Sequence, residues 1–152
     1  MATTNGKKDR QAETRRAARL MKRILIHFRS QMDEALRPQR VTTAQLQVLY
    51  AIRSEPGASG AQLARSCYVT PQSAQSLLKG LEEGGWIVRV KDKVNDRILV
   101  AQLTPSGEEL IETAEKAARV IEKKVWKDVS DDAVGALNAV LEQCLENLEL
   151  ES

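Results

Sequence analysis

Apolar side chains recur every three or four positions along residues 16–40, which is the spacing of a helix with one buried face. This helix is expected to end near Arg37-Pro38, because a proline disfavours helical geometry in the residue before it. Two shorter helices are predicted to follow, each beginning at a capping box formed by a hydroxyl residue and a Gln three positions later. The apolar residues of the first helix are Met21, Ile24, Leu25, Phe28, Met32, Ala35 and Leu36, and the capping boxes are Thr42 with Gln45 and Ser59 with Gln62.

The stretch "TPQSAQSLLKGLEEGGW", from Thr70 to Trp86, predicts a helix with an unusual polar face. Thr70 suits the N-cap and Pro71 the first helical position, since the N–H that proline lacks has no partner there. A helix that only faces water usually exposes Glu, Lys and Arg, whereas the first two turns here offer short hydrogen-bonding side chains. The apolar face is Ala74, Leu77, Leu78 and Leu81, and Gly84-Gly85 ends the helix.

A short helix, a tight connection and a second helix with a hydrogen-bonding face are typical of a helix-turn-helix. A helix that enters the major groove needs side chains that reach base edges: Gln pairs with adenine, Ser donates or accepts, and Lys reaches guanine or phosphate. The alternative is a helical hairpin with a polar surface and no binding role. The expected DNA contacts of this helix are Thr70, Gln72, Ser73, Gln75, Ser76 and Lys79.

The segments "WIVRV" (86–90) and "RILVAQL" (97–103) are rich in aliphatic and β-branched residues and predict a two-stranded ribbon. A ribbon beside a recognition helix is a wing, whose tip reaches phosphates or an adjacent minor groove. The alternative for each tip residue is a solvated side chain. The expected DNA contacts of the wing are Lys91, Lys93 and Arg97.

Two further helices are predicted to follow, beginning at Thr104-Pro105 and at Ser130, and both carry coiled-coil-like apolar seams. Because two-fold DNA sites are read by two-fold proteins, we expect these helices to serve dimerisation; completing a monomer's core is the alternative. The expected fold is mainly α with a small β-wing. Its parts are a flexible basic segment at 1–15, a winged helix-turn-helix at 41–104, and a helical dimerisation region at 16–40 and 105–150.

The charge of the chain is divided unevenly along its length. Residues 1–100 hold 18 Lys and Arg against 9 Asp and Glu, a net charge of +9, and residues 101–152 hold 5 against 12, a net charge of −7. A basic portion favours a polyanionic partner. The 152 residues, 42% hydrophobic, are those of a soluble globular protein, and no apolar run has the length of a membrane helix. Without a signal-peptide pattern or paired cysteines, a cytoplasmic location is expected.

The order of these elements resembles the MarR family of bacterial transcriptional regulators. The resemblance covers about residues 16–148, and it is carried by "GAQLARSCYVTPQSAQSLLKGLEEGGWIVR" and "NDRILVAQLTPSG". The family places an Asp-x-Arg motif in the wing ahead of a Leu-Thr-x-x-Gly helix start. Arg97, Leu103, Thr104 and Gly107 match, whereas Asn95 stands where the family has aspartate.

The resemblance implies a DNA-binding transcriptional regulator, expected to be a repressor. It would act as a homodimer on a palindromic operator and be released by a small aromatic or phenolic effector. It also implies that Arg97 contacts the minor groove or a phosphate. By the same resemblance an effector pocket lies between the first, second and fifth helices, without a residue of this chain assigned to it. The competing function is a winged-helix protein–protein adaptor that does not bind DNA.

Neither enzymatic nor metal chemistry is expected. The chain has no GxSxG, phosphate-loop, HExxH or paired-cysteine motif, and His27 is its sole histidine. No catalytic residue, metal site or cofactor is therefore predicted. Peroxide-sensing members of the family carry a reactive cysteine early in the first helix, and this chain has none there. Cys67 and Cys144 are instead expected to pack as small buried side chains.

Overall fold

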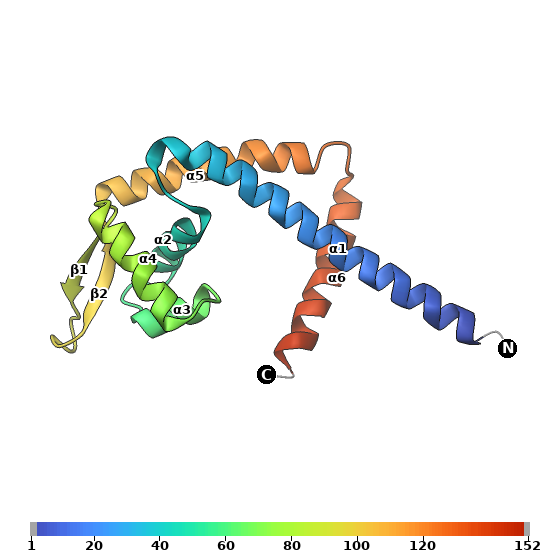
Figure 1. Ribbon diagram of the computed structural model, residues 1–152, viewed down its shortest axis with the longest axis horizontal. Helices are drawn as coiled ribbons and strands as arrows, with labels where there is room; N and C mark the ends of the chain where they lie inside the picture. Colours follow the sequence, from blue (N-terminus) through green and yellow to red (C-terminus); the bar gives the residue numbers. More distant parts are fainter. Residues whose placement is uncertain (1–2, 151–152) are drawn as a thin grey trace. The chain divides into compact units, whose positions relative to one another are not determined.

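The computed structural model describes residues 3–150, with side chains from residue 6 on, and is mainly helical with one β-hairpin (Figure 1). This confirms the predicted fold class. Every predicted helix and both predicted strands are present, with ends that differ from the prediction by a few residues except at the start of the first helix. The elements are α1 (Thr3–Leu36), a 3-10 turn (Arg37–Gln39), α2 (Thr43–Ser54), α3 (Gly60–Ser66), α4 (Pro71–Glu83), β1 (Ile87–Lys91), β2 (Leu99–Leu103), α5 (Pro105–Val125) and α6 (Asp131–Glu149).

The chain divides into two compact units, one up to Ile121 and one from Glu122. The first unit holds α1 to α4, the hairpin and most of α5, and the second holds the end of α5 and all of α6. The functional division drawn from the sequence, with separate DNA-binding and dimerisation regions, stays a prediction.

Local hydrogen bonds set the helix starts as the sequence predicts. Both capping boxes form, with Thr42 accepting from the Gln45 backbone at the start of α2 and Ser59 accepting from that of Gln62 at the start of α3. Ser130 Oγ likewise accepts from the Ala133 backbone at the start of α6. Each of these oxygens satisfies an N–H that has no partner inside its helix.

Helix α1 begins at Thr3, well before the start near residue 16 that the sequence predicts. Residues 7–19 consist largely of Lys, Arg, Gln, Glu and Ala, which are good helix formers and are not interrupted by proline. Apolar periodicity finds only helices with a buried face, and this part of α1 is exposed throughout its described side chains. The flexibility expected of residues 1–15 stays a prediction, and residues 1 and 2 lie outside the described range.

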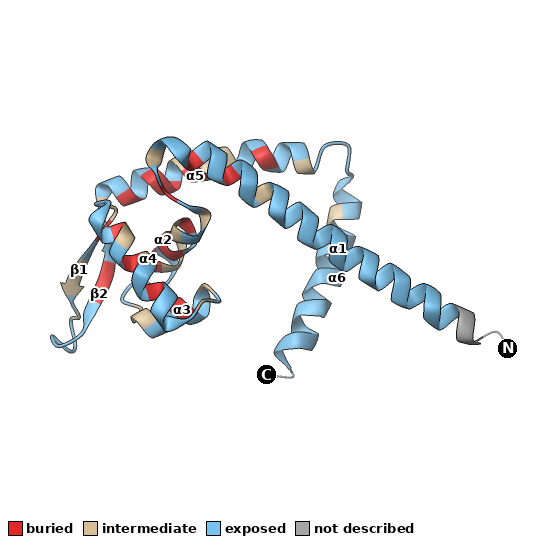
Figure 2. Ribbon diagram, in the orientation of Figure 1, coloured by how far each residue is buried: buried red, intermediate tan, exposed pale blue. Residues whose placement is uncertain are grey.

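The core of the first unit lies where α2, α3 and α4 pack on one another and on the base of the hairpin (Figure 2). The strands pair antiparallel, with Ile87 opposite Leu103 and Val90 opposite Val100. The end of α1 and the start of α5 close this core with further aliphatic side chains. Its most completely buried side chains are Leu36, Leu49, Leu63, Leu81, Ile87, Ile111 and Val48.

The start of α5 packs tightly against the end of α4. Thr104 donates its N–H to the Trp86 carbonyl and its hydroxyl to the Gly85 carbonyl, at 3.0 and 2.7 Å. The same hydroxyl accepts from the Gly107 N–H and so caps α5. A Cβ at position 107 would overlap the Trp86 carbonyl oxygen, which explains why glycine stands there.

Each unit also exposes apolar side chains. In the first unit these include Leu20, Met21, Ile24 and Leu25 on α1, and no described residue of α6 in the second unit is buried. Cys144 of α6 is exposed, so the burial expected for it is wrong: its helix presents an apolar face that the second unit does not cover. Across residues 3–150, no helix has both the length and the apolarity needed to cross a lipid bilayer.

Candidate nucleic-acid interface

The connection between α3 and α4 is a tight turn. Tyr68 adopts a left-handed backbone conformation with φ of 54°, and the Val69 N–H returns to the Ala64 carbonyl at 3.0 Å. Tyr68 itself is 90% exposed, so its strained backbone is held by the turn and not by packing of its ring. Cys67, just before it, is half-buried, and burial, with a smaller contribution from Glu55, raises the pKa of its thiol.

Thr70 starts α4 in the way the sequence predicts. Its Oγ1 accepts from the Ser73 backbone N–H at 3.1 Å and donates to Ser73 Oγ at 2.9 Å. Both hydroxyls therefore lie at the exposed amino end of α4, where the helix dipole favours negative charge. This is the end of the helix that the sequence predicts to enter the groove.

The structure brings three of the predicted contacts together on the outer face of α4. Gln72, Ser76 and Lys79 are exposed, opposite the face that buries Ala74, Leu78 and Leu81 in the core. Lys79 lies 3.9 Å from Glu83, and both side chains are largely in solvent, so the pair is weak. The outer face thus carries amide, hydroxyl and ammonium groups within its first three turns.

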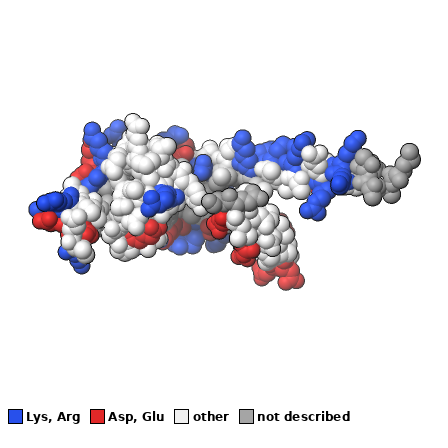
Figure 3. All heavy atoms as spheres, turned by 90° about the horizontal axis from the view of Figure 1, so that it is seen from below, with Lys and Arg blue, Asp and Glu red and all other residues white. Residues whose placement is uncertain are grey.

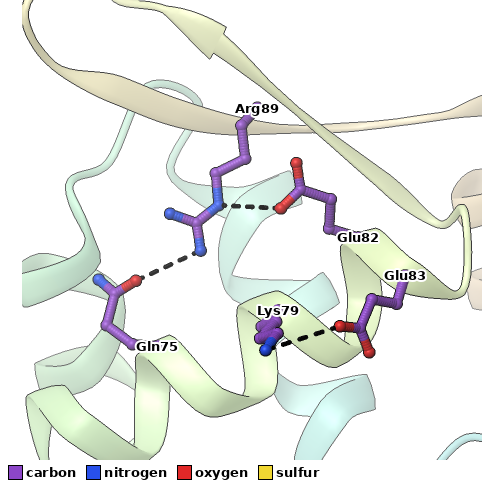
Figure 4. Close-up of polar contacts among 5 residues, drawn as sticks. All are labelled: Gln75, Lys79, Glu82, Glu83 and Arg89. Atoms are coloured by element: carbon purple, nitrogen blue, oxygen red, sulfur yellow. Dashed lines mark hydrogen bonds and ion pairs between the residues drawn. The ribbon is translucent and has the colours of Figure 1, made fainter.

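Gln75 lies on the flank of α4 beside the wing and differs from the other predicted contacts. Its Oε1 accepts a hydrogen bond from Arg89 Nη2 of β1 at 3.3 Å (Figure 4). Arg89 Nε in turn lies 3.7 Å from Glu82 Oε2. One guanidinium thereby bridges two turns of α4.

The tip of the wing is ordered by two short polar side chains. Asp92 Oδ2 accepts from the backbone N–H groups of Val94 and Asn95, at 3.1 and 3.0 Å. Asn95 Oδ1 accepts from the backbone N–H of Arg97 at 3.1 Å. The residue in the place of the family's aspartate therefore fixes the backbone of Arg97.

The three cations predicted for the wing lie at this tip. Lys91, Lys93 and Arg97 are all exposed, and within residues 3–150 none of the three forms an ion pair. Their charges are therefore available to a partner. No group of three His, Cys, Asp or Glu side chains in this same range is placed to hold a metal ion.

Cations also gather along one side of α1, as Figure 3 shows. The residues recur at helical spacing, on the side of α1 opposite Leu20, Met21, Ile24 and Leu25. In the second unit, α6 carries only acidic charges, from Asp131 to Glu149. The basic members of the α1 stripe are Lys8, Arg15, Arg16, Arg19, Lys22 and Arg23, all exposed.

Comparison with known proteins identifies this arrangement. Residues 41–98 match the model of the MarR family. The transcriptional repressors Rv2887 of Mycobacterium tuberculosis and Mb2911 of Mycobacterium bovis are each 33% identical over 106 residues, covering 70% of this chain and 76% of theirs. The chain belongs to the MarR family.

Solved structures agree with this assignment. A crystal structure of MarR is 27% identical, with a TM-score of 0.76 over 87% of this chain and 90% of that one. A mutant MarR from E. coli complexed with operator DNA shares the fold, with 23% identity and a TM-score of 0.75 over 88% of this chain and 96% of that one. These relatives are regulators and not enzymes, and the protein is a MarR-family transcriptional regulator.

Arg89 is the residue of this MarR-family site that the sequence did not single out. It is 21% exposed, and its Nε is buried without a hydrogen-bond partner among the described residues. A signal was present in the alternation of β1: Arg89 shares the face of Ile87, which points into the core. An arginine on the inner face of a strand needs anionic or amide partners nearby.

Proposed function

We propose that this MarR-family regulator is a sequence-specific repressor, which binds a palindromic operator as a homodimer through α4 and the wing. The observation that carries the proposal is that the first unit exposes two surfaces suited to DNA, one on α4 and one at the wing tip. Hydrogen-bonding side chains cover the outer face of α4, and cations without ion pairs among the described residues stand at the wing tip. The first suits base edges and the second suits phosphates or a minor groove.

The residues of α4 divide into two roles under this proposal. Gln72 and Ser76 read base edges, and Lys79 reaches guanine or a phosphate. Thr70 and Ser73, at the amino end of the helix, lie where hydroxyls and backbone N–H groups bind phosphate. Lys91, Lys93 and Arg97 of the wing contact the phosphate backbone or the minor groove of the DNA beside the site of α4. The acidic residues of α4, Glu82 and Glu83, stand at its far end, away from these contacts.

Dimerisation is supported by apolar surface in both units. Leu20, Met21 and Ile24 on α1 and Leu145 and Leu148 on α6 are each 45–68% exposed. Surfaces of this kind on adjacent turns mark an interface. A second copy of the chain would cover them and set the separation of two α4 helices, which a palindrome requires.

The experiment is binding to a duplex that the protein selects from a random pool, measured across salt concentrations. If Lys79, Lys91, Lys93 and Arg97 of both protomers meet phosphates, log K falls with log salt with a slope of about −7. A flat response identifies the alternative, a protein–protein adaptor without DNA binding.

Release by a small aromatic or phenolic effector belongs to the same proposal. It is supported by relatives of the same fold: CouR from Rhodococcus jostii was solved bound to p-coumaroyl-CoA, and DNA binding by BpsR of Bordetella bronchiseptica is regulated by 6-hydroxynicotinic acid. Screening small aromatic and phenolic compounds for loss of operator binding tests it, and the absence of any active compound contradicts it.

A further inference from the structure

The guanidinium of Arg89 joins the wing to the recognition helix at two points. Nη2 donates to Gln75 Oε1, and Nε lies within ion-pair distance of Glu82 Oε2 (Figure 4). These two residues are seven positions apart on α4, which corresponds to about 10 Å along the helix axis. The Arg89 clamp, meaning Arg89 with Gln75 and Glu82, therefore connects β1 to two turns of α4.

The amide of Gln75 also fills the space beside Gly60, where a larger residue would collide with it. A Cβ built on Gly60, the first residue of α3, would lie 2.6 Å from Gln75 Nε2. The amide also borders a cavity of about 30 Å³ that is lined by α3, α4 and both strands, including Arg89 and Leu99. Although Gln75 as a residue is exposed, its amide lies at the junction of α3, α4 and the wing.

This placement conflicts with base reading. A glutamine that reads adenine presents both its oxygen and its nitrogen to the base edge. Here Oε1 accepts from Arg89 and Nε2 lies in the space that a side chain at position 60 would occupy, whereas Gln72 and Ser76 of the same helix are exposed on its outer face. Helical spacing in the sequence places Gln75 on the flank of this face, but it does not show which element lies beside that flank.

We infer that Gln75 is a positioning residue: through Arg89 it sets where the wing cations stand relative to the recognition helix, and it does not contact a base. The inference rests on the proposed DNA-binding function. Lys91 follows Arg89 by two positions on β1, so any movement of that strand displaces the wing tip. When Arg89 contacts Gln75 and Glu82, the wing is already placed beside α4. Binding of both to one duplex then does not cost the conformational entropy of ordering the wing.

The first test compares Gln75→Ala with Gln72→Ala on every single-base variant of the selected operator. Gln75→Ala is expected to weaken binding by roughly tenfold and by the same factor on all variants, because it loosens the wing. Gln72→Ala, the control on the outer face, is expected to relax preference at one base pair in each half-site. Relaxed preference at one base pair for Gln75→Ala would overturn the inference.

The second test asks whether the wing depends on the clamp. Arg97→Ala is introduced into the wild type, into Gln75→Ala and into Gln75→Glu, with thermal midpoints confirming that each variant is folded. In the Gln75→Ala background, Arg97→Ala is expected to lower DNA affinity by less than about threefold. The effect shrinks because coupled residues give non-additive losses. In the Gln75→Glu background the carboxylate still accepts from Arg89. Arg97→Ala is therefore expected to lower DNA affinity there by as much as it does in the wild type. A glutamate cannot replace the amide toward adenine, so this rescue separates positioning from base reading.

Additive losses in Gln75→Ala overturn the inference and leave the proposed function intact. A wild-type protein that binds no duplex, even in dilute buffer, overturns both.

Discussion

Arg97 stands at the wing tip with its backbone fixed by Asn95 and its guanidinium exposed. The sequence predicts Arg97 as a DNA contact but leaves open how it is held, because asparagine replaces the usual aspartate of the motif. The structure answers this: an amide oxygen accepts the Arg97 N–H as a carboxylate would, but it adds no charge beside the guanidinium. Within residues 3–150 Arg97 forms no ion pair, so its guanidinium is available to DNA.

Arg97→Ala is expected to weaken binding on every duplex sequence. A dimer loses two cations, so the slope of log K against log salt is expected to become shallower by about 1.8. Arg97→Lys serves as the control and should keep most of the slope, since it keeps the charge. Affinity lost on a single operator sequence, with an unchanged slope, would show that Arg97 reads a base instead.

Cys67 illustrates the effect of burial on a single thiol. Because burial raises its pKa, a smaller fraction of Cys67 is thiolate at a given pH than for an ordinary thiol. Two variants each keep one cysteine: Cys144→Ser keeps Cys67, and Cys67→Ser keeps Cys144. Near pH 8, iodoacetamide is expected to alkylate Cys67 in the first variant more slowly than Cys144 in the second. The difference should disappear in urea, and equal rates in the folded protein would contradict it.

At the scale of elements, the sequence predicts what local interactions decide. Thr42, Ser59, Thr70 and Ser130 each begin a helix because each bonds an N–H three residues ahead. These bonds are set by residue type and spacing, so a pattern reveals them. The hairpin and the end of α4 at Gly84-Gly85 were predictable for the same reason.

Contacts between distant residues were not predictable. The Arg89 clamp joins residues up to 14 positions apart, and the pairing of Gln75 with Arg89 depends on how β1 docks on α4. Helical spacing places Gln75 on the flank of α4, but it does not show that β1 lies beside that flank. The start of α1 at Thr3 was missed for a different reason: helix propensity without a buried face leaves no periodic signal.

The junction of α4 with α5 gives a prediction at this scale. Gly107→Ala is expected to lower the free energy of unfolding by about 1–3 kcal/mol, because the added methyl group would overlap the Trp86 carbonyl. Gly135→Ala in α6 is the control, since a Cβ there meets no atom within 4 Å; it should stabilise by about 0.5–1 kcal/mol through helix propensity alone. Urea unfolding of both variants measures the difference, and two equal changes would contradict the proposed overlap.

At the scale of the whole molecule, charge and apolar surface both point to assembly. The stripe of Lys and Arg on α1 and the acids of α6 have opposite signs, and each helix also exposes a row of apolar side chains. Two copies of the chain could pair such surfaces, since opposite charges and apolar area both favour contact.

Leu145→Glu is therefore expected to break the dimer. A charge placed on the exposed apolar face of α6 loses the gain from burial and must be desolvated on assembly. Ala139→Glu, on the polar side of the same helix, should leave the dimer intact. Analytical ultracentrifugation at micromolar protein distinguishes one chain of 16.9 kDa from twice that mass. A wild-type protein that sediments as one chain contradicts the proposed assembly.

The amino-terminal half of α1 contributes no residue to the core of its own unit. An isolated helix of that length is marginal in water, so a lone chain gains little by keeping it wound. Association would supply the missing support, which makes its helicity a function of how many chains are present. The helical content of this arm is therefore expected to fall as the protein is diluted below the concentration at which two copies associate.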